Sequence, residues 1–337
     1  MEVEYIGYGN CSGFGIAATD YVLALDSVGV DVKFRPIDAM VSRFFMPDKQ
    51  KKLDALRRKR VSSNAIQIFH CIPDQQRRYF TKKNKTVCLA TFESTKMPSH
   101  WHKYISANDL VITPSEFCFN TFKRYDPITV PHALDFSYWS PRELGGARSF
   151  TFMAVGAWKQ RKGWHELALA WKDFPDCHLK IITDMKDKAR IKFGQYNNVS
   201  YHTKIQDMAE VMSTADCIVC PTKGEGFGLV GAQALSLQIP LVVTDWSGVQ
   251  EYANTENATM VPAEIKTLPS MDNLYQFKKQ ECAIISPDIL SSKMREVIDR
   301  PNFSQKKAQR GCKIVRDELS YERVGHKFSK ALETLNP

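Results

Sequence analysis

Short apolar runs alternate with longer amphipathic stretches through the first part of the chain. The apolar runs lie at residues 3–8, 30–36, 65–69, 86–90 and 110–113. Turn or polar residues bound each run, as is typical of strands that are buried on both faces of a parallel sheet. A Gly-rich turn at residues 9–15 follows the first run, and residues 16–25 then show a helical pattern.

A second series of the same kind begins near residue 150. Its apolar runs lie at residues 150–156, 179–183, 199–202, 217–220 and 241–244, with helical patterns between them. This alternation predicts an α/β protein with two Rossmann-like domains, each built on a parallel sheet. A polar stretch with Pro and two Gly at residues 140–146 predicts the domain boundary. We therefore expect domains at residues 1–141 and 142–316, followed by a C-terminal helical segment at residues 317–337.

The composition is that of an ordinary globular protein. A length of 337 residues fits about two domains. Hydrophobic residues make up 43% and charged residues 25%, which excludes a disordered chain, a collagen-like fibre and a small disulfide scaffold. The sequence shows neither a signal-peptide pattern nor an apolar stretch of about 18 residues. Nine scattered cysteines are typical of free thiols in a reducing compartment, so we expect a cytoplasmic protein, either free or peripheral at a membrane surface.

Positive charge is concentrated in one segment of the first domain. The formal net charge is +9, and residues 49–85 alone contain twelve Lys or Arg and two Asp. Leu53 and Leu56 have the spacing of an apolar helix face. The cations around them are Lys51, Lys52, Arg57, Arg58, Lys59 and Arg60. A basic amphipathic helix fits an anionic membrane surface or a nucleic-acid backbone, with a merely solvated helix as the alternative. The local excess exceeds what solubility requires, so we favour an anionic partner.

A glycine-rich turn follows the apolar run at residues 217–220. Residues 221–229 read Pro-Thr-Lys-Gly-Glu-Gly-Phe-Gly-Leu, and a helical pattern begins at residue 230. Unpaired N–H groups at a helix N-terminus suit phosphate, and glycines let a ligand approach the backbone closely. Glu225 lies in this turn at the carboxyl end of a strand, where α/β folds bind ligands. A turn that only needs tight packing is the alternative interpretation.

Three cations follow the apolar run at residues 150–156. Lys159, Arg161 and Lys162 lie just before a helical pattern at residues 164–171. Such a cluster at the carboxyl end of a strand suits a diphosphate. A solvated basic loop is the alternative.

Together, the two stretches resemble the retaining nucleotide-sugar glycosyltransferases of family 4, which have the GT-B fold. The resemblance extends from the Gly-rich turn near the N-terminus to the final helix. Five motifs occur in the family's order, at residues 113–117, 130–135, 155–163, 225–233 and 244–251. We therefore expect an N-terminal acceptor domain and a C-terminal donor domain facing each other across a cleft. We also expect the final helix to cross back to the N-terminal domain.

The resemblance implies roles for individual residues. Lys162 would pair with the donor diphosphate, with Arg161 nearby, and Glu225 would hydrogen-bond the hydroxyls of the donor sugar. The remaining donor-site residues would be Gly13 and Gly15 of the first domain, Lys159, and the backbone of Gly226, Phe227, Gly228 and Leu229. The leaving group would be a nucleoside diphosphate, whose developing charge the cations and the helix N-terminus would stabilise.

Two residues of the donor site depart from the family pattern. Gln233 stands where the family has a second glutamate, which holds the ribose hydroxyls. Ala157 stands where the family has an arginine, so that Lys159 or Arg161 would take over its phosphate contact.

A third departure concerns Glu93, which lies near the position of a histidine in many family members. Its carboxylate is a candidate catalytic group, either as a base toward the acceptor or as a stabiliser of the positive charge that develops on the sugar. An ion pair between Glu93 and Lys96 is the structural alternative.

The sequence predicts no metal site and no cofactor, the nucleotide-sugar donor being a substrate. No Asp-x-Asp sequence occurs in the chain, whereas metal-dependent glycosyltransferases of the other major fold typically hold a divalent ion with one. Cys217 and Cys220 lie in an apolar run and are expected to be core thiols. His100 and His102 have no evident third ligand.

Two classes of function remain. The first is a glycosyltransferase that moves a sugar from a nucleoside-diphosphate sugar, with retention and without a metal, to an acceptor that is polyanionic, such as modified DNA or an anionic lipid. The second is a noncatalytic relative that binds a nucleotide or a polyanion, which Gln233 and Ala157 keep open.

Overall fold

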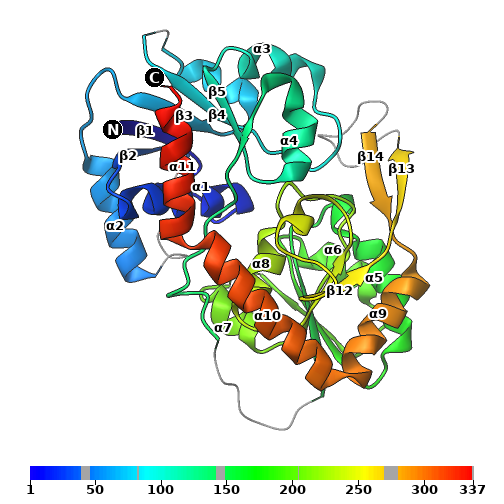
Figure 1. Ribbon diagram of the computed structural model, residues 1–337. Coiled ribbons are helices and arrows are strands. Elements are labelled where there is room, and N and C mark those ends of the chain that lie inside the picture. Colours follow the sequence, from blue (N-terminus) through cyan, green and yellow to red (C-terminus); the bar gives the residue numbers. More distant parts are fainter. Residues whose placement is uncertain (39–45, 82, 142–148, 204, 269–279, 336–337) are drawn as a thin grey trace. The chain divides into compact units, whose positions relative to one another are not determined.

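The computed structural model describes residues 1–337 except 39–45, 82, 142–148, 204, 269–279 and 336–337. The chain forms two compact units (Figure 1). Unit 1 comprises Met1–Asp135 and Asp317–Pro337, and unit 2 comprises Phe136–Arg316. The units thus divide after Asp135, whereas the sequence predicted a boundary after residue 141. Most of the predicted linker, residues 142–146, lies outside the described residues.

Unit 1 is built on a parallel sheet with the strand order β2-β1-β3-β4-β5-β6. The strands are β1 (Glu2–Gly7), β2 (Asp31–Pro36), β3 (Ile66–His70), β4 (Thr86–Leu89), β5 (Leu110–Thr113) and β6 (Ile128–Thr129). Within this sheet Val3 of β1 lies opposite Val32 on one side and Ile66 on the other. Strands β3, β4 and β5 are buried at every position, which explains their unbroken apolar sequences.

The last helix of the chain belongs to unit 1. The helices of this unit are α1 (Gly13–Ser27), α2 (Pro47–Arg58), α3 (His102–Ile105), α4 (Glu116–Phe122) and α11 (Tyr321–Glu333). Helix α11 lies beside α1 in Figure 1, and the rings of Phe328 and Tyr21 are 5.3 Å apart between centroids. The Tyr321 hydroxyl donates to the Asp20 carboxylate at 2.6 Å. Apolar and polar contacts together hold α11 on α1.

Unit 2 is built on a second parallel sheet, with the strand order β12-β11-β10-β7-β8-β9. The strands are β7 (Thr151–Val155), β8 (His178–Ile182), β9 (Val199–His202), β10 (Cys217–Cys220), β11 (Leu241–Thr244) and β12 (Thr259–Val261). The helices are α5 (Trp164–Ala170), α6 (Lys186–Phe193), α7 (Met208–Ser213), α8 (Leu229–Ser236), α9 (Pro287–Asp299) and α10 (Pro301–Leu319). An antiparallel hairpin of β13 (Glu264–Leu268) and β14 (Gln280–Ile284) lies between β12 and α9 in the chain.

The predicted α/β class with two parallel sheets is confirmed, and each predicted strand lies within one residue of its expected bounds. Helix α1 begins at Gly13, earlier than predicted, because the Ser12 side chain caps it by accepting from the Gly15 N–H. The edge strands β6 and β12 and the β13–β14 hairpin were not predicted. Among the described residues, no helix is both long and apolar enough to cross a membrane.

Candidate functional site

Two loops leave neighbouring strands at the same edge of the unit 2 sheet. We call residues 156–163, after β7, the cation loop, and residues 221–228, after β10, the glycine loop. Strands β7 and β10 pair in parallel, so their carboxyl ends lie side by side. The loops are in close contact, because a Cβ atom added to Gly163 would lie 1.8 Å from the carbonyl oxygen of Pro221. Gly163 also has a φ of 71°, which favours glycine.

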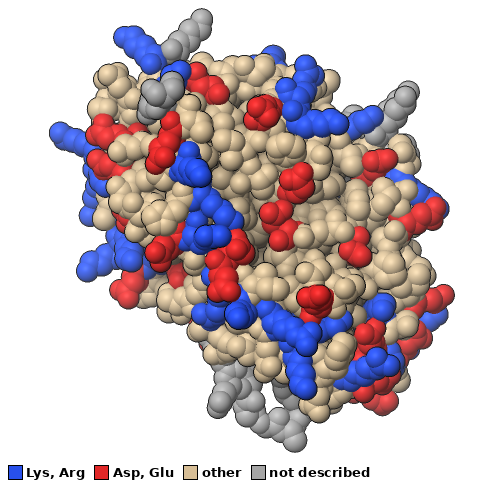
Figure 2. All heavy atoms as spheres, viewed as in Figure 1, with Lys and Arg blue, Asp and Glu red and all other residues tan. Residues whose placement is uncertain are grey.

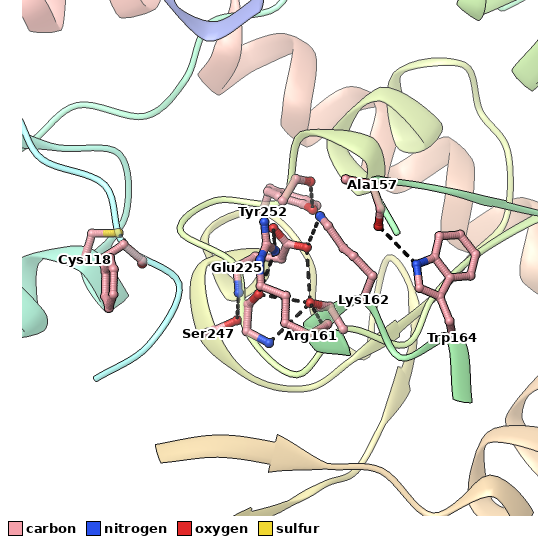
Figure 3. Close-up of polar contacts among 12 residues, drawn as sticks. Cys118, Ala157, Arg161, Lys162, Trp164, Glu225, Ser247 and Tyr252 are labelled. Carbon is pink, nitrogen blue, oxygen red and sulfur yellow. Dashed lines mark hydrogen bonds and ion pairs between the residues drawn. The ribbon is translucent and has the colours of Figure 1, made fainter. Parts of the chain in front are cut away.

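Glu225 of the glycine loop is bound by both cations of the facing loop. One Arg161 guanidinium nitrogen lies 3.0 Å from Oε2, and the Lys162 ammonium lies 2.5 Å from Oε1. The Thr222 hydroxyl donates to Oε1 at 3.1 Å. Figure 3 shows the Glu225 carboxylate between the two cations. The side chains are only 12–18% exposed, so the pairs are weakly screened by solvent.

The charges set the ionisation of Glu225. Burial alone would raise the pKa of its carboxyl group, but the Lys162 and Arg161 cations outweigh this effect and lower the pKa to about 2. The carboxylate is therefore ionised throughout the physiological range. It occupies cations that could otherwise bind the phosphates of a ligand.

A third segment, residues 247–252, fixes the backbone of the glycine loop. The Ser247 hydroxyl accepts from the Glu225 N–H, and the Gly248 N–H donates to the Glu225 carbonyl, both at 2.9 Å. The Tyr252 hydroxyl donates to the carbonyl of Gly228 at 2.5 Å. Gly228 precedes α8 with a φ of 88°, and a Cβ atom there would lie 2.7 Å from Val249. The entry into α8 is therefore held in one conformation.

The sequence of this region matches a known domain. A family model described as "Glycosyl transferases group 1" matches residues 149–269, which include both loops and the third segment. The chain carries a glycosyl transferases group 1 domain. That domain lies within unit 2 and contains the whole Glu225 cluster.

A curated relative is an uncharacterized glycosyltransferase of Methanocaldococcus jannaschii. The two sequences are 26% identical over 174 residues, which cover 49% of this chain and 47% of the relative. The chain therefore spans about half the length of this curated relative. The predicted resemblance to glycosyltransferases is confirmed by the domain and by this relative.

Solved structures with the same fold extend over 99% of the chain. Anabaena HepE in complex with UDP-glucose has a TM-score of 0.74 at 13% identity, covering 100% of that chain. A glycosyltransferase from Rickettsia africae has a TM-score of 0.73 at 13% identity, covering 98% of that chain. Sucrose-phosphate synthase from Thermosynechococcus elongatus has a TM-score of 0.70 at 14% identity, covering 99% of that chain. The predicted GT-B fold is confirmed.

The structure brings three of the predicted donor-site residues of the group 1 domain into one cluster, namely Arg161, Lys162 and Glu225. The predicted backbone groups follow in the chain, with Gly226 and Phe227 buried and Leu229 at the start of α8. Lys159 is exposed in the cation loop, and Gln233 is 5% exposed within α8. The carbonyl oxygen of Ala157 accepts from the Trp164 indole at 3.1 Å. The ligand contacts assigned to these residues stay predictions.

The predicted site residues of unit 1 lie in the segments that follow strands β1 and β4. Gly13 and Gly15 form the first turn of α1, and a Cβ atom on Gly15 would lie 2.0 Å from the Asn10 carbonyl oxygen. The Asp38 carboxylate accepts from the Gly9 N–H at 2.6 Å. Glu93 is half-buried in the loop after β4. Its catalytic role stays a prediction.

Helix α2 carries the predicted basic surface. Leu53 and Leu56 are buried, while Lys51, Lys52, Arg57, Arg58 and Arg60 are exposed. Three cations of this region have acidic partners: Lys49 pairs with Asp20, Arg57 with Asp54 at 3.1 Å and Lys59 with Asp31 at 2.6 Å. Figure 2 shows Lys and Arg side chains at the left edge, where Figure 1 places α2, with Asp and Glu among them. Lys82 of the basic segment lies outside the described residues.

Several residues of the site were not singled out from the sequence. Thr222 lies in the glycine-rich turn at residues 221–229 and Ser247 in the motif at residues 244–251, so their positions alone could have identified them. Tyr252 follows such a motif directly. No local signal identified Asp38, because its contact joins it to a turn far away in the sequence.

Proposed function

We propose that the protein transfers a sugar from a nucleoside-diphosphate sugar to an acceptor. The observation that carries this proposal is the Glu225 carboxylate bound by Arg161 and Lys162 beside the N-terminus of α8, within a group 1 domain. Two cations and a helix N-terminus suit a diphosphate, and a carboxylate suits sugar hydroxyls. Anabaena HepE, which shares the fold, has been solved with UDP-glucose.

In this proposal the diphosphate of the donor replaces the Glu225 carboxylate as the partner of the two cations. Its diphosphate takes contacts with Arg161 and Lys162, and Glu225 turns from them toward the hydroxyls of the sugar. As the bond between sugar and phosphate breaks, negative charge grows on the leaving nucleoside diphosphate. The cations and the N–H groups that begin α8 stabilise that charge. Because these groups neutralise the leaving group, the reaction needs no divalent metal.

Three further features of the reaction belong to the proposal. The resemblance to family 4 supports retention of anomeric configuration. It also supports roles for Gly13 and Gly15 in binding the diphosphate and for Glu93 in the transfer of the sugar. Gln233 accepts from the ribose hydroxyls as a neutral amide.

The acceptor carries phosphate groups, which bind the exposed cations of α2. Lys51, Lys52 and Arg58 of α2, and Arg60 just after it, are exposed and have a buried apolar face, Leu53 and Leu56, behind them. Cations in such a row neutralise neighbouring phosphates, with a strong dependence on salt. Anionic vesicles and DNA are the two sources of phosphate to compare at low salt, and binding to neither would contradict this part of the proposal.

The main proposal is tested by measuring whether the protein cleaves nucleoside-diphosphate sugars, by hydrolysis or by sugar transfer. The protein is incubated with UDP-, GDP-, ADP-, CDP- and dTDP-sugars, and release of the nucleoside diphosphate is followed with and without EDTA. We expect release from one donor class in the presence of EDTA. Loss of release with EDTA would contradict metal independence. Tight nucleotide binding without release from any donor would favour the noncatalytic alternative, which the substitutions Gln233 and Ala157 support.

A further inference from the structure

Lys223 is a buried lysine in the glycine loop, two residues before Glu225. It is 7% exposed, and its ammonium lies 2.8 Å from a carboxylate oxygen of Glu166. Its N–H donates to the Arg161 carbonyl at 2.6 Å, and its own carbonyl accepts from the Ala283 N–H of β14 at 3.0 Å. Lys223 thus connects the glycine loop with the cation loop, with α5 and with the β13–β14 hairpin.

Its partner Glu166 lies on α5, four residues after Lys162, and is 8% exposed. The second carboxylate oxygen of Glu166 has no hydrogen-bond partner among the residues that the structure describes. A buried ion pair of this kind contributes little net stability compared with apolar side chains of the same size. Its best-attested use is to specify one register between two segments.

Both segments carry their cations before their carboxylate along the chain. The first segment carries the cations Arg161 and Lys162 and then the carboxylate of Glu166. The second carries the cation Lys223 and then the carboxylate of Glu225. Each cation faces a carboxylate of the other segment. Because the two pairings have opposite polarity, a slip of one segment along the other would bring like charges together.

We propose that Lys223 and Glu166 form a positioning pair that fixes the register of the two loops and so sets where Glu225 lies relative to Arg161 and Lys162. The inference rests on the proposed function, because its effect is measured on donor turnover. Neither member of the pair touches the donor, since both act through Glu225. A displacement of about 1 Å in an active site can cost about 10²-fold in rate, and we expect losses on this scale when the pair is broken.

The test compares Lys223→Met, Glu166→Gln and the exchanged double variant Glu166→Lys/Lys223→Glu with the wild-type protein. Lys307→Met is the matched control. Lys307 is also a buried lysine of unit 2, with 8% of its surface exposed. Its ammonium donates to the Ala258 carbonyl at 3.1 Å, and both residues lie outside the two loops. The Tm of each variant is measured first. The kcat and the KM for the donor are then measured well below the Tm of every variant.

We expect each single variant to lose about 10²-fold in kcat/KM, with most of the loss in kcat. The exchanged double variant restores an ion pair but gives both pairings the same polarity, so we expect it to recover less than about tenfold of that loss. Lys307→Met should lower Tm while leaving kcat/KM unchanged. Lys223→Arg, which keeps the cation, should stay within about tenfold of the wild-type value and serves where the double variant does not fold.

Single variants that lower Tm as Lys307→Met does, yet keep wild-type kcat/KM, would overturn the positioning role and leave the proposed function intact. Absence of turnover by the wild-type protein with every donor class would contradict the proposed function, and the inference with it. The wild-type measurement therefore separates the two failures.

Discussion

The two units bury polar groups at the ends of their parallel strands in opposite ways. In unit 1 the group is neutral: His70, the last residue of β3, shares a 2.8 Å hydrogen bond with the Tyr5 hydroxyl and stacks on His132 with ring centroids 6.2 Å apart. In unit 2 the group is charged, with Glu225 between Arg161 and Lys162. A neutral aromatic cluster is held by packing. A cluster of paired charges can exchange one anion for another, which is what binding a phosphate requires.

Acidification gives the largest expected contrast between the units. Burial lowers the pKa of His70 to about 3, whereas an unfolded histidine titrates near 6.5. The unfolded chain therefore binds the proton first, and unit 1 loses stability as the pH falls from about 6.5 to about 3, in total about 5 kcal/mol. Burial, with the neighbouring His70, also lowers the pKa of His132, which adds to the effect.

The Glu225 cluster of unit 2 should respond only at lower pH. The pKa of Glu225 is about 2, below that of an unfolded glutamate, so its contribution is present above pH of about 4.5 and is lost below it. Hydrogen exchange in peptides from β3 and β10, corrected for the intrinsic rate at each pH, measures both units. At pH 5 we expect a larger loss of protection in β3 than in β10, because burial lowers the pKa of the partly exposed His178 and His202 of unit 2 as well. Equal losses of protection in the two strands would contradict this prediction. The double variant Tyr5→Phe/His70→Phe, which lacks the buried histidine, is the control.

Removal of the central carboxylate comes next in size. Glu225→Ala should lower kcat/KM for sugar transfer by about 10³-fold, or about 4 kcal/mol. The cations lose the carboxylate that positions them, and the hydroxyls of the donor sugar lose the carboxylate that accepts their hydrogen bonds. Asp187→Ala is the control, since Asp187 is an exposed carboxylate on α6 whose side chain is 84% exposed. Unchanged turnover in Glu225→Ala would refute the role of Glu225.

A variant that removes only the charge of Glu225 tests whether its carboxylate competes with a nucleoside diphosphate for the two cations. Glu225→Gln leaves Arg161 and Lys162 without their buried counter-charge, so a free nucleoside diphosphate no longer has to displace a carboxylate. We expect its affinity to rise about tenfold while transfer falls. Calorimetric titration of both proteins with the same nucleotide measures this. Weaker binding by Glu225→Gln would show that the carboxylate supports the diphosphate instead of competing with it.

The smallest effect is expected on the surface of α2. The double variant Arg57→Glu/Arg58→Glu should weaken binding to a phosphate-rich partner and flatten its dependence on salt. Its stability should change by no more than about 0.5 kcal/mol, because both side chains are exposed. Co-sedimentation with anionic vesicles and a DNA mobility shift, each over a range of salt, measure the binding. An unaltered salt dependence would indicate that α2 is only solvated.

The sequence predicted the parts of the molecule that depend on local pattern. Strands such as β5, buried at every position, appear as apolar runs, and the glycine loop appears through its glycines. The β13–β14 hairpin has no such signal, because charged residues such as Lys266 and Glu281 interrupt both strands. The pairing of Lys223 with Glu166 was also unpredictable, since it depends on the parallel neighbours β7 and β10 bringing distant loops together.

The most direct test of the account is the thermal stability of the wild-type protein and of Lys162→Met with UDP, GDP, ADP, CDP and dTDP. A nucleotide at 100 times its Kd stabilises the native state by about 2.7 kcal/mol. We predict that one nucleotide raises the Tm of the wild-type protein clearly and that Lys162→Met loses most of this shift. No shift with any nucleotide, or an equal shift in both proteins, would contradict a diphosphate site at Arg161, Lys162 and Glu225.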